Sequence, residues 1–102
     1  MRGSVKKQIE IKFVGFPKVY DFFKGPCIQH AFKGKTLLNL IEDLMVYYGE
    51  PLRESFLIKR TQALDLTIQA KVNGNYIKRE AFNRQVIEDG DRVTLLRLMA
   101  GG

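Results

Sequence analysis

The last two residues of the sequence, Gly101 and Gly102, have no side chains, so the reactive group at this end is the terminal carboxylate. Glycine makes up roughly 7% of average sequence, and two glycines are expected at an end about once in 200 chains. One interpretation is a frayed tail, because disorder gathers at chain ends. The alternative interpretation is that the carboxylate of Gly102 is itself the group that reacts.

Cys27 and His30 are a second candidate for chemistry, as the one cysteine and the one histidine of the sequence. Both lie in the alternating segment CIQHAFK (27–33), which predicts a strand. Residues three apart on a strand point to opposite faces, which argues against a Cys–His dyad. We expect Cys27 to be a small buried hydrophobic residue, with a catalytic thiol as the alternative. We expect no metal site and no cofactor, because the sequence offers no Cys/His cluster with zinc spacing.

Composition and length indicate a single domain spanning residues 1–102, with 45% hydrophobic residues to build a core. A single cysteine cannot form an internal disulfide, which fits a reducing compartment. The charged start MRGSVKKQIE lacks the apolar core of a secretory signal, and no apolar run approaches the roughly 20 residues that span a bilayer. The expected location is therefore the cytoplasm, without membrane contact.

The net charge of +6 is concentrated in the N-terminal third. Residues 1–35 contain eight lysines and arginines and two acidic residues, whereas residues 36–102 contain nine of each. Such asymmetry indicates a nucleic acid, an acidic protein partner or simply a solvated surface. The sequence shows no aromatic RNA-recognition motif, helix-turn-helix signal or glycine-rich phosphate loop, so nucleic acid is the less favoured partner.

The first third of the sequence predicts two strands joined by a long segment. KQIEIKFVGF (7–16) alternates apolar and polar residues, with Ile9, Ile11 and Phe13 on one face. The segment 15–26 is bounded by Gly-Phe-Pro and Gly-Pro and predicts a long connection or a hairpin extension. Its aromatic side chains either pack over an edge of the core or form a partner surface: Tyr20, Phe22 and Phe23.

A helix is predicted within GKTLLNLIEDLMVYYGEP (34–51). The hydroxyl of Thr36 can cap its start, and Gly49 followed by Pro51 ends it. Apolar residues recur at helical spacing and predict a core-facing stripe, with Leu38 on its flank. The stripe consists of Leu37, Leu40, Ile41, Leu44, Met45 and Tyr48.

The second half predicts a short helical turn around Leu52–Phe56, a loop, and then three strands. The first strand alternates over 66–72, with Leu66, Ile68, Ala70 and Val72 on one face. Asn73-Gly74-Asn75 predicts a tight turn before a short strand at YIKR. One irregular or helical turn in EAFNRQVI and a turn at Asp89-Gly90 precede the last strand, RVTLLRL.

The predicted order is two strands, one long helix and three further strands, which indicates a two-layer α+β fold with a mixed sheet. One long helix covers one face of such a sheet and leaves the other largely open. On the last strand, Val93, Leu95 and Arg97 point one way, and Thr94, Leu96 and Leu98 point the other way. Both faces carry leucine, so either a loop covers the second face or Leu96 or Leu98 forms an apolar partner surface.

The stretch VNGNYIKREAFNRQVIEDGDRVTLLRLMAGG resembles the C-terminal half of the ThiS/MoaD sulfur-carrier family. The matching features are the VNG turn at 72–74, the DGD turn at 89–91 with the strand after it, and the terminal Gly-Gly. The segment KTLLNLIEDL resembles the first helix of the family. The resemblance is good over residues 66–102 and fair over 33–45.

The resemblance implies the β-grasp fold of ubiquitin and a carrier that is a protein cosubstrate rather than an enzyme. A ubiquitin-activating-like adenylyltransferase would use ATP to adenylate the terminal glycine, and sulfur from a persulfide would displace AMP. The resulting thiocarboxylate would deliver sulfur to a thiazole synthase or to the large subunit of molybdopterin synthase. The chain is long, as in the molybdopterin branch, whereas 76–98 look more like the thiamine branch, so both remain open.

With this chemistry, the carboxylate of Gly102 is the reacting group and Gly101 lets the backbone enter a narrow channel. A carboxylate with a pKa of about 3.5 is an anion at neutral pH, able to attack the α-phosphate of ATP. The flexible tail is expected to begin at about residue 99. The residues expected to contact partners are Leu96, Leu98, Met99 and Ala100.

Two other functions remain open at this point. A ubiquitin-like modifier would join Gly102 to lysines of other proteins through the same activated carboxylate. A basic β-grasp domain that binds RNA would instead use the charge of residues 1–35 and leave the tail idle.

Overall fold

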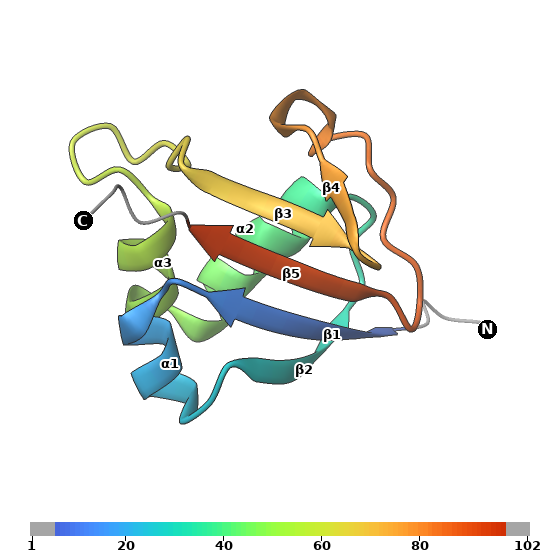
Figure 1. The fold of residues 1–102 in the computed structure, drawn as a ribbon, viewed down its shortest axis with the longest axis horizontal. Helices are drawn as coiled ribbons and strands as arrows, with labels where there is room; N and C mark the ends of the chain where they lie inside the picture. The colour runs from blue at the N-terminus through green and yellow to red at the C-terminus, as the bar shows by residue number, and fades with distance from the viewer. Residues whose placement is uncertain (1–5, 98–102) are drawn as a thin grey trace.

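The computed structural model describes residues 6–97, which form a five-stranded sheet with three α-helices and a short 3-10 helix (Figure 1). The elements in chain order are β1 (Lys7–Val14), α1 (Pro17–Phe23), β2 (Cys27–Phe32), α2 (Leu37–Tyr48), α3 (Glu50–Phe56), β3 (Ile68–Val72), β4 (Asn75–Ile77), the 3-10 helix (Arg79–Ala81) and β5 (Arg92–Arg97).

The sheet is mixed, as the sequence predicts, with strand order β2-β1-β5-β3-β4. β1 and β5 are parallel, and every other neighbouring pair is antiparallel. α2 lies across one face of the sheet, and Figure 1 looks onto the opposite face, which no helix of residues 6–97 covers. α1 and α3 contact each other at the end of the sheet where β1 and β5 finish. The chain therefore leaves β5 at this helical end.

The helix α2 is built as predicted. The Thr36 hydroxyl accepts from the Asn39 amide at 3.1 Å, and the Asn39 side-chain oxygen accepts from the Thr36 amide at 3.1 Å. This reciprocal cap satisfies two backbone N–H groups that the first turn leaves free. The predicted stripe faces the core, with Met45, Tyr48 and the flanking Leu38 only partly buried. Its fully buried members and their predicted partners on the strands are Leu37, Leu40, Ile41, Leu44, Ile9, Ile11, Ile68 and Val93.

The segment between the first two strands differs from the prediction, because it contains the helix α1 rather than an extended connection. Pro17 occupies the first turn, where its missing N–H is not needed. Val19 is buried and Phe23 packs against the core, whereas Tyr20 and Phe22 are exposed. The aromatic residues are thus divided between the core and the surface.

Two further expectations are wrong in detail. Cys27 is exposed, because it lies on the uncovered face of the edge strand β2, opposite Lys12 of β1. Leu66 is 77% exposed and precedes β3, which begins at Ile68. The carboxylate of Asp65 accepts from the Thr67 amide at 2.9 Å, and this local turn replaces the first residues of the expected strand. The helical turn predicted around Leu52–Phe56 is confirmed as α3.

Candidate functional site

The uncovered face of the sheet has an apolar patch at the end of β5. Val14 of β1 is 42% exposed and pairs with Leu96 of β5, which is half-buried. Gln69 of β3 adjoins Leu96 on its other side. We call these two apolar residues the Val14–Leu96 patch. Leu98, Met99, Ala100, Gly101 and Gly102, which the sequence also singles out, lie outside the described residues.

The same face is polar away from this patch. Arg92, at the start of β5, lies 3.5 Å from the Glu10 carboxylate, and the Lys71 amine lies 4.7 Å from the centre of the Tyr76 ring. The apolar part of the β1–β5 surface is therefore confined to the end from which the chain continues towards Gly102.

Arg97 is the last described residue of β5, and its side chain turns to the helical side of the sheet. The guanidinium Nη2 donates to the backbone oxygen of Ser55, and the same atom is 3.4 Å from the Asp65 carboxylate. The guanidinium carbon is also 5.1 Å from the centre of the Phe16 ring. One side chain thus joins the end of β5 to α3, to the loop before β3 and to the turn after β1.

The acceptor in this cluster, Asp65, is held in its ionised form. Hydrogen bonds from the backbone amide and hydroxyl of Thr67, at 2.9 and 2.8 Å, lower the pKa of the Asp65 carboxyl below its ordinary value. Burial opposes these hydrogen bonds with a smaller effect, and the positive charges of Arg97 and Arg79 lower the pKa further, each by less than burial raises it. Asp65 is therefore a fixed negative partner for Arg97 at neutral pH.

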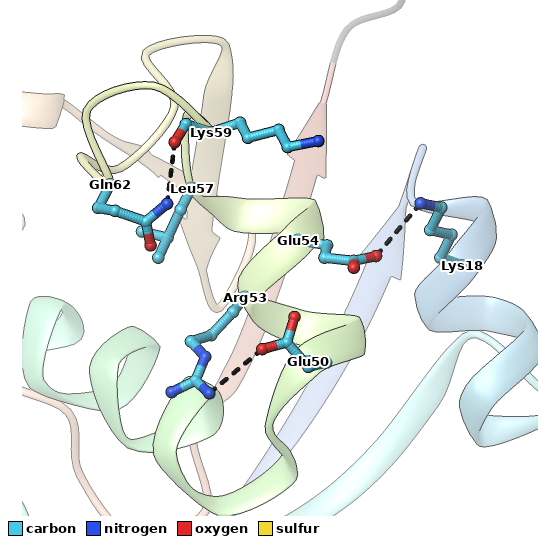
Figure 2. Close-up of a pocket in the computed structure, with 7 residues that line it drawn as sticks. All are labelled: Lys18, Glu50, Arg53, Glu54, Leu57, Lys59 and Gln62. Atoms are coloured by element: carbon cyan, nitrogen blue, oxygen red, sulfur yellow. Dashed lines mark hydrogen bonds and ion pairs between the residues drawn. The ribbon is translucent and has the colours of Figure 1, made fainter.

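A hollow of about 400 Å³ lies between α1, α3 and the start of the loop that follows α3 (Figure 2). Its charges are largely paired with one another: Lys18 lies 3.2 Å from Glu54, and Arg53 lies 3.4 Å from Glu50. Gln62 donates to the Lys59 backbone oxygen across its upper rim. The hollow is lined by Lys18, Glu50, Arg53, Glu54, Leu57, Lys59 and Gln62. These side chains include no thiol, hydroxyl or imidazole, and the carboxylates of Glu50 and Glu54 are engaged in ion pairs.

His30 is buried on the helical side of β2, on the face opposite Cys27, as the strand alternation predicts. Its Nε2 lies 2.7 Å from the Asp43 carboxylate, and its Nδ1 lies 3.4 Å from the Tyr48 hydroxyl. Burial raises the pKa of Tyr48, and the charges of Tyr47 and Asp43 add to this effect, so the phenol stays protonated at neutral pH. The two faces of the sheet separate the thiol from the imidazole, which excludes a Cys27–His30 dyad.

Three lysines of the N-terminal third lie in different surroundings. The Lys7 amine donates to the backbone oxygens of Gly34 and Ile87 at 3.0 and 2.8 Å. Lys18 pairs with Glu54 on the helical side, and Lys12 lies on the uncovered face of β1. A nucleic-acid site needs a continuous basic patch or stripe, and these three lysines do not form one.

Within residues 6–97, no three His, Cys, Asp or Glu side chains lie close enough to hold a metal ion. No helix in the same range has the length and the apolar character that crossing a membrane requires.

One feature of the site, the set of contacts made by Arg97, was not predicted, although the sequence carried a signal for it. The strand alternation already placed Arg97 on the same face as Val93 and Leu95. An arginine on a covered face needs a paired acceptor, and that need was the available signal. The acceptors themselves, a backbone oxygen and Asp65, come from segments distant in the sequence and carry no local pattern.

The family model that matches this chain describes the ThiS family and covers residues 27–102. No curated protein sequence matches the chain significantly.

Solved structures with similar folds include an archaeal modifier protein, a Urm1 protein and a chain of a molybdopterin-converting factor. The small archaeal modifier protein 1 of Methanosarcina acetivorans has a TM-score of 0.69 at 16% identity, covering 95% of this chain and 98% of that one. Urm1 of Trypanosoma brucei has a TM-score of 0.64 at 24% identity, covering 100% of this chain and 100% of that one. A chain in the complex of subunits 1 and 2 of the molybdopterin-converting factor of Helicobacter pylori has a TM-score of 0.56 at 22% identity, covering 93% and 99%. These similarities confirm the ubiquitin-like β-grasp fold.

Proposed function

Because the chain belongs to the ThiS family, we propose that it is a sulfur carrier whose Gly102 carboxylate is adenylated and then converted to a thiocarboxylate. The observation that carries the proposal is the family match, which extends through the terminal Gly-Gly. We also propose that residues 1–102 form one domain with a tail of about residues 99–102. The tail would carry the reacting group, and the fold would dock and orient it.

The chemistry proceeds in two transfers. A carboxylate oxygen of Gly102 attacks the α-phosphorus of ATP, and pyrophosphate leaves. The terminal sulfur of an enzyme persulfide then attacks the acyl carbon, and AMP leaves. A thiol reduces the remaining S–S bond, which releases the thiocarboxylate and leaves a disulfide on the donor side. No side chain of the carrier is needed as acid or base, so we assign it the role of a cosubstrate rather than an enzyme.

The fold offers a suitable place for the activating enzyme to bind. The Val14–Leu96 patch is apolar, lies on the uncovered face and adjoins the end of β5. Four residues beyond Leu98 extend at most about 14 Å, which allows the carboxylate to enter a buried nucleotide site while the patch remains bound. We propose that this surface binds an adenylyltransferase of the ubiquitin-activating type.

The sulfur acceptor is proposed to be a cofactor synthase, either a thiazole synthase or a molybdopterin synthase large subunit. The similar fold in the molybdopterin-converting factor occurs in a complex of two subunits, which supports a synthase-type partner. Mixing the thiocarboxylated protein with each purified synthase and its substrate would identify the branch, because only the true acceptor would regenerate the plain carboxylate.

The activation step is tested with three forms of the protein: the full chain, a chain lacking Gly102, and a chain with one alanine added after Gly102. Each is incubated with the candidate adenylyltransferase, ATP and labelled pyrophosphate. We expect exchange of label into ATP with the full chain alone, because the reacting carboxylate is displaced by one residue in the other two. Equal exchange with all three forms would contradict the proposal.

A further inference from the structure

We propose that Arg97 is a positioning residue, which fixes the direction in which the C-terminal tail leaves β5 and thereby places Gly102 for adenylation. The inference rests on the proposed function and assigns a role to a side chain that would touch neither ATP nor the reacting atoms. It follows from the three segments that Arg97 joins at the root of the tail.

The first observation is that Arg97 is a charged residue on the covered face of the sheet. It follows Val93 and Leu95 in the same alternation, and its side chain is only 26% exposed. A charge in such a position is tolerated when its donors are paired. Here Nη2 is paired with the Ser55 backbone oxygen and the Asp65 carboxylate, whereas the buried Nε has no hydrogen-bond partner within residues 6–97. The planar guanidinium lies over the Phe16 ring, which adds a cation–π contact.

The acceptors of Arg97 are themselves fixed. Asp65 receives two hydrogen bonds from Thr67, and Arg79 donates to the backbone oxygen of Asp65 at 3.1 Å. Arg79 also donates to the Leu64 backbone oxygen at 2.9 Å. These four hydrogen bonds hold the part of the loop before β3 that the Arg97 side chain contacts.

The turn after β1 lies close to the backbone of Arg97. Gly15 has a φ of +84°, and a Cβ built on it would collide with the carbonyl oxygen of Arg97. Glycine is needed here for the left-handed conformation and for the close approach of the two backbones. The turn after β1 therefore passes directly beside the carbonyl of the last described residue of β5.

The direction in which the chain leaves Arg97 matters because the tail is short and the reacting atoms must be placed accurately. The five residues after Arg97 span at most about 17 Å when extended, and a swing of about 20° at the root moves the tip by about 6 Å. Reacting atoms must come within about 3–3.5 Å, and misplacement by about 1 Å can lower a rate about 100-fold. If the chain direction at Arg97 is fixed, Gly102 samples a narrower range of positions around the nucleotide site.

Arg97 and the docking surface lie on opposite faces of β5. Loss of the Arg97 contacts should therefore leave the Val14–Leu96 patch unchanged and affect the step after docking. This separates positioning from binding: kcat for adenylation should fall, whereas KM for the carrier should stay constant. A general loss of folding would lower the concentration of active protein instead and would appear as a shifted thermal unfolding curve.

The experiment compares Arg97→Gln with Arg92→Gln in pyrophosphate exchange with the adenylyltransferase. Arg92 lies in the same strand, and its side chain is 76% exposed on the other face, which makes it a matched control. Asp65→Asn serves as a second variant, because it retains the size of the side chain and an acceptor for Thr67 while it removes the charge that faces Arg97. Thermal unfolding of each variant is recorded in parallel.

We expect kcat to fall about 10-fold to 100-fold in Arg97→Gln, with KM for the carrier within about twofold of the unmodified chain. Asp65→Asn should show a smaller fall in kcat, and Arg92→Gln none. A fall that lies in KM, an equal fall in Arg92→Gln, or an unchanged kcat in both Arg97→Gln and Asp65→Asn would overturn the positioning role. Absence of exchange with the unmodified chain would instead contradict the proposed function, and this inference with it.

Discussion

The ionisation of the Asp65 carboxyl affects the contacts of Arg97, the last described residue of β5. Its pKa is lowered chiefly by the hydrogen bonds from Thr67, with a further contribution from the charge of Arg97. A carboxyl with a lowered pKa stabilises the folded state above its unfolded pKa, and this contribution is lost as the pH falls through the folded pKa. The relevant pH range therefore begins near the ordinary value of 3.8 and continues below it.

We accordingly predict that acid weakens the folded state partly through Asp65. In Asp65→Asn, the loss of stability on going from neutral pH to pH values below 3.8 should be smaller than in the unmodified chain. Urea unfolding at a series of pH values measures this difference. Glu88→Gln, at an exposed glutamate distant from Arg97, provides the control. Parallel stability curves for Asp65→Asn and the unmodified chain would show that Asp65 is not stabilised in its ionised form.

At the scale of elements, α2 holds the sheet in place. Its buried stripe packs against residues from β1, β3 and β5, so the strand that leads to the tail shares one core with the helix. Figure 1 shows this helix crossing behind β3 and β5. Damage to the stripe should therefore lower the stability of the whole fold rather than of one segment.

Ile41→Ala should lower the free energy of unfolding by about 2–5 kcal/mol, because it leaves a cavity in a packed core. Val46→Ala, on the same helix at a side chain that is 79% exposed, should change it by less than about 0.5 kcal/mol. Chemical denaturation of both variants measures the difference. Similar values for the two would mean that α2 does not pack as described.

The elements with strong periodicity were predictable from the sequence, and those formed by distant contacts were not. α2 has an apolar stripe over three turns and the Thr36 cap, so both its range and its buried face are correct. α1 is only seven residues long, and its Gly-Phe-Pro start was interpreted as a break, although Pro17 favours a first helical turn. The site shows the same division: Leu96 was located by alternation, whereas the role of Asp65 depends on a loop conformation.

At the scale of the whole molecule, the two faces of the sheet differ in what covers them. The helical face contains the core and the Arg97 contacts, and the uncovered face offers the Val14–Leu96 patch for a partner. Both faces meet at the end of β5, where the tail begins. In the proposed function, this end of the sheet would both dock the partner and orient the tail.

Leu96→Asp should weaken binding of the adenylyltransferase while the protein remains folded, because the substitution places a charge in an apolar contact on the uncovered face. Val46→Asp, which places the same charge on the exposed side of α2, should leave binding unchanged. Titration of each variant by calorimetry measures the dissociation constant, and circular dichroism reports the fold. Unfolding of Leu96→Asp, or equal affinity for both variants, would show that Leu96 belongs to the core or faces no partner.

The most direct test of the sulfur-carrier proposal is the intact mass of the protein after incubation with the adenylyltransferase, ATP and a persulfide donor. We predict a mass increase that corresponds to the exchange of one oxygen for sulfur, confined to the C-terminal peptide and absent when ATP is omitted. A C-terminal peptide that keeps its plain carboxylate, or one found in isopeptide linkage to lysines of other proteins, would contradict the proposal.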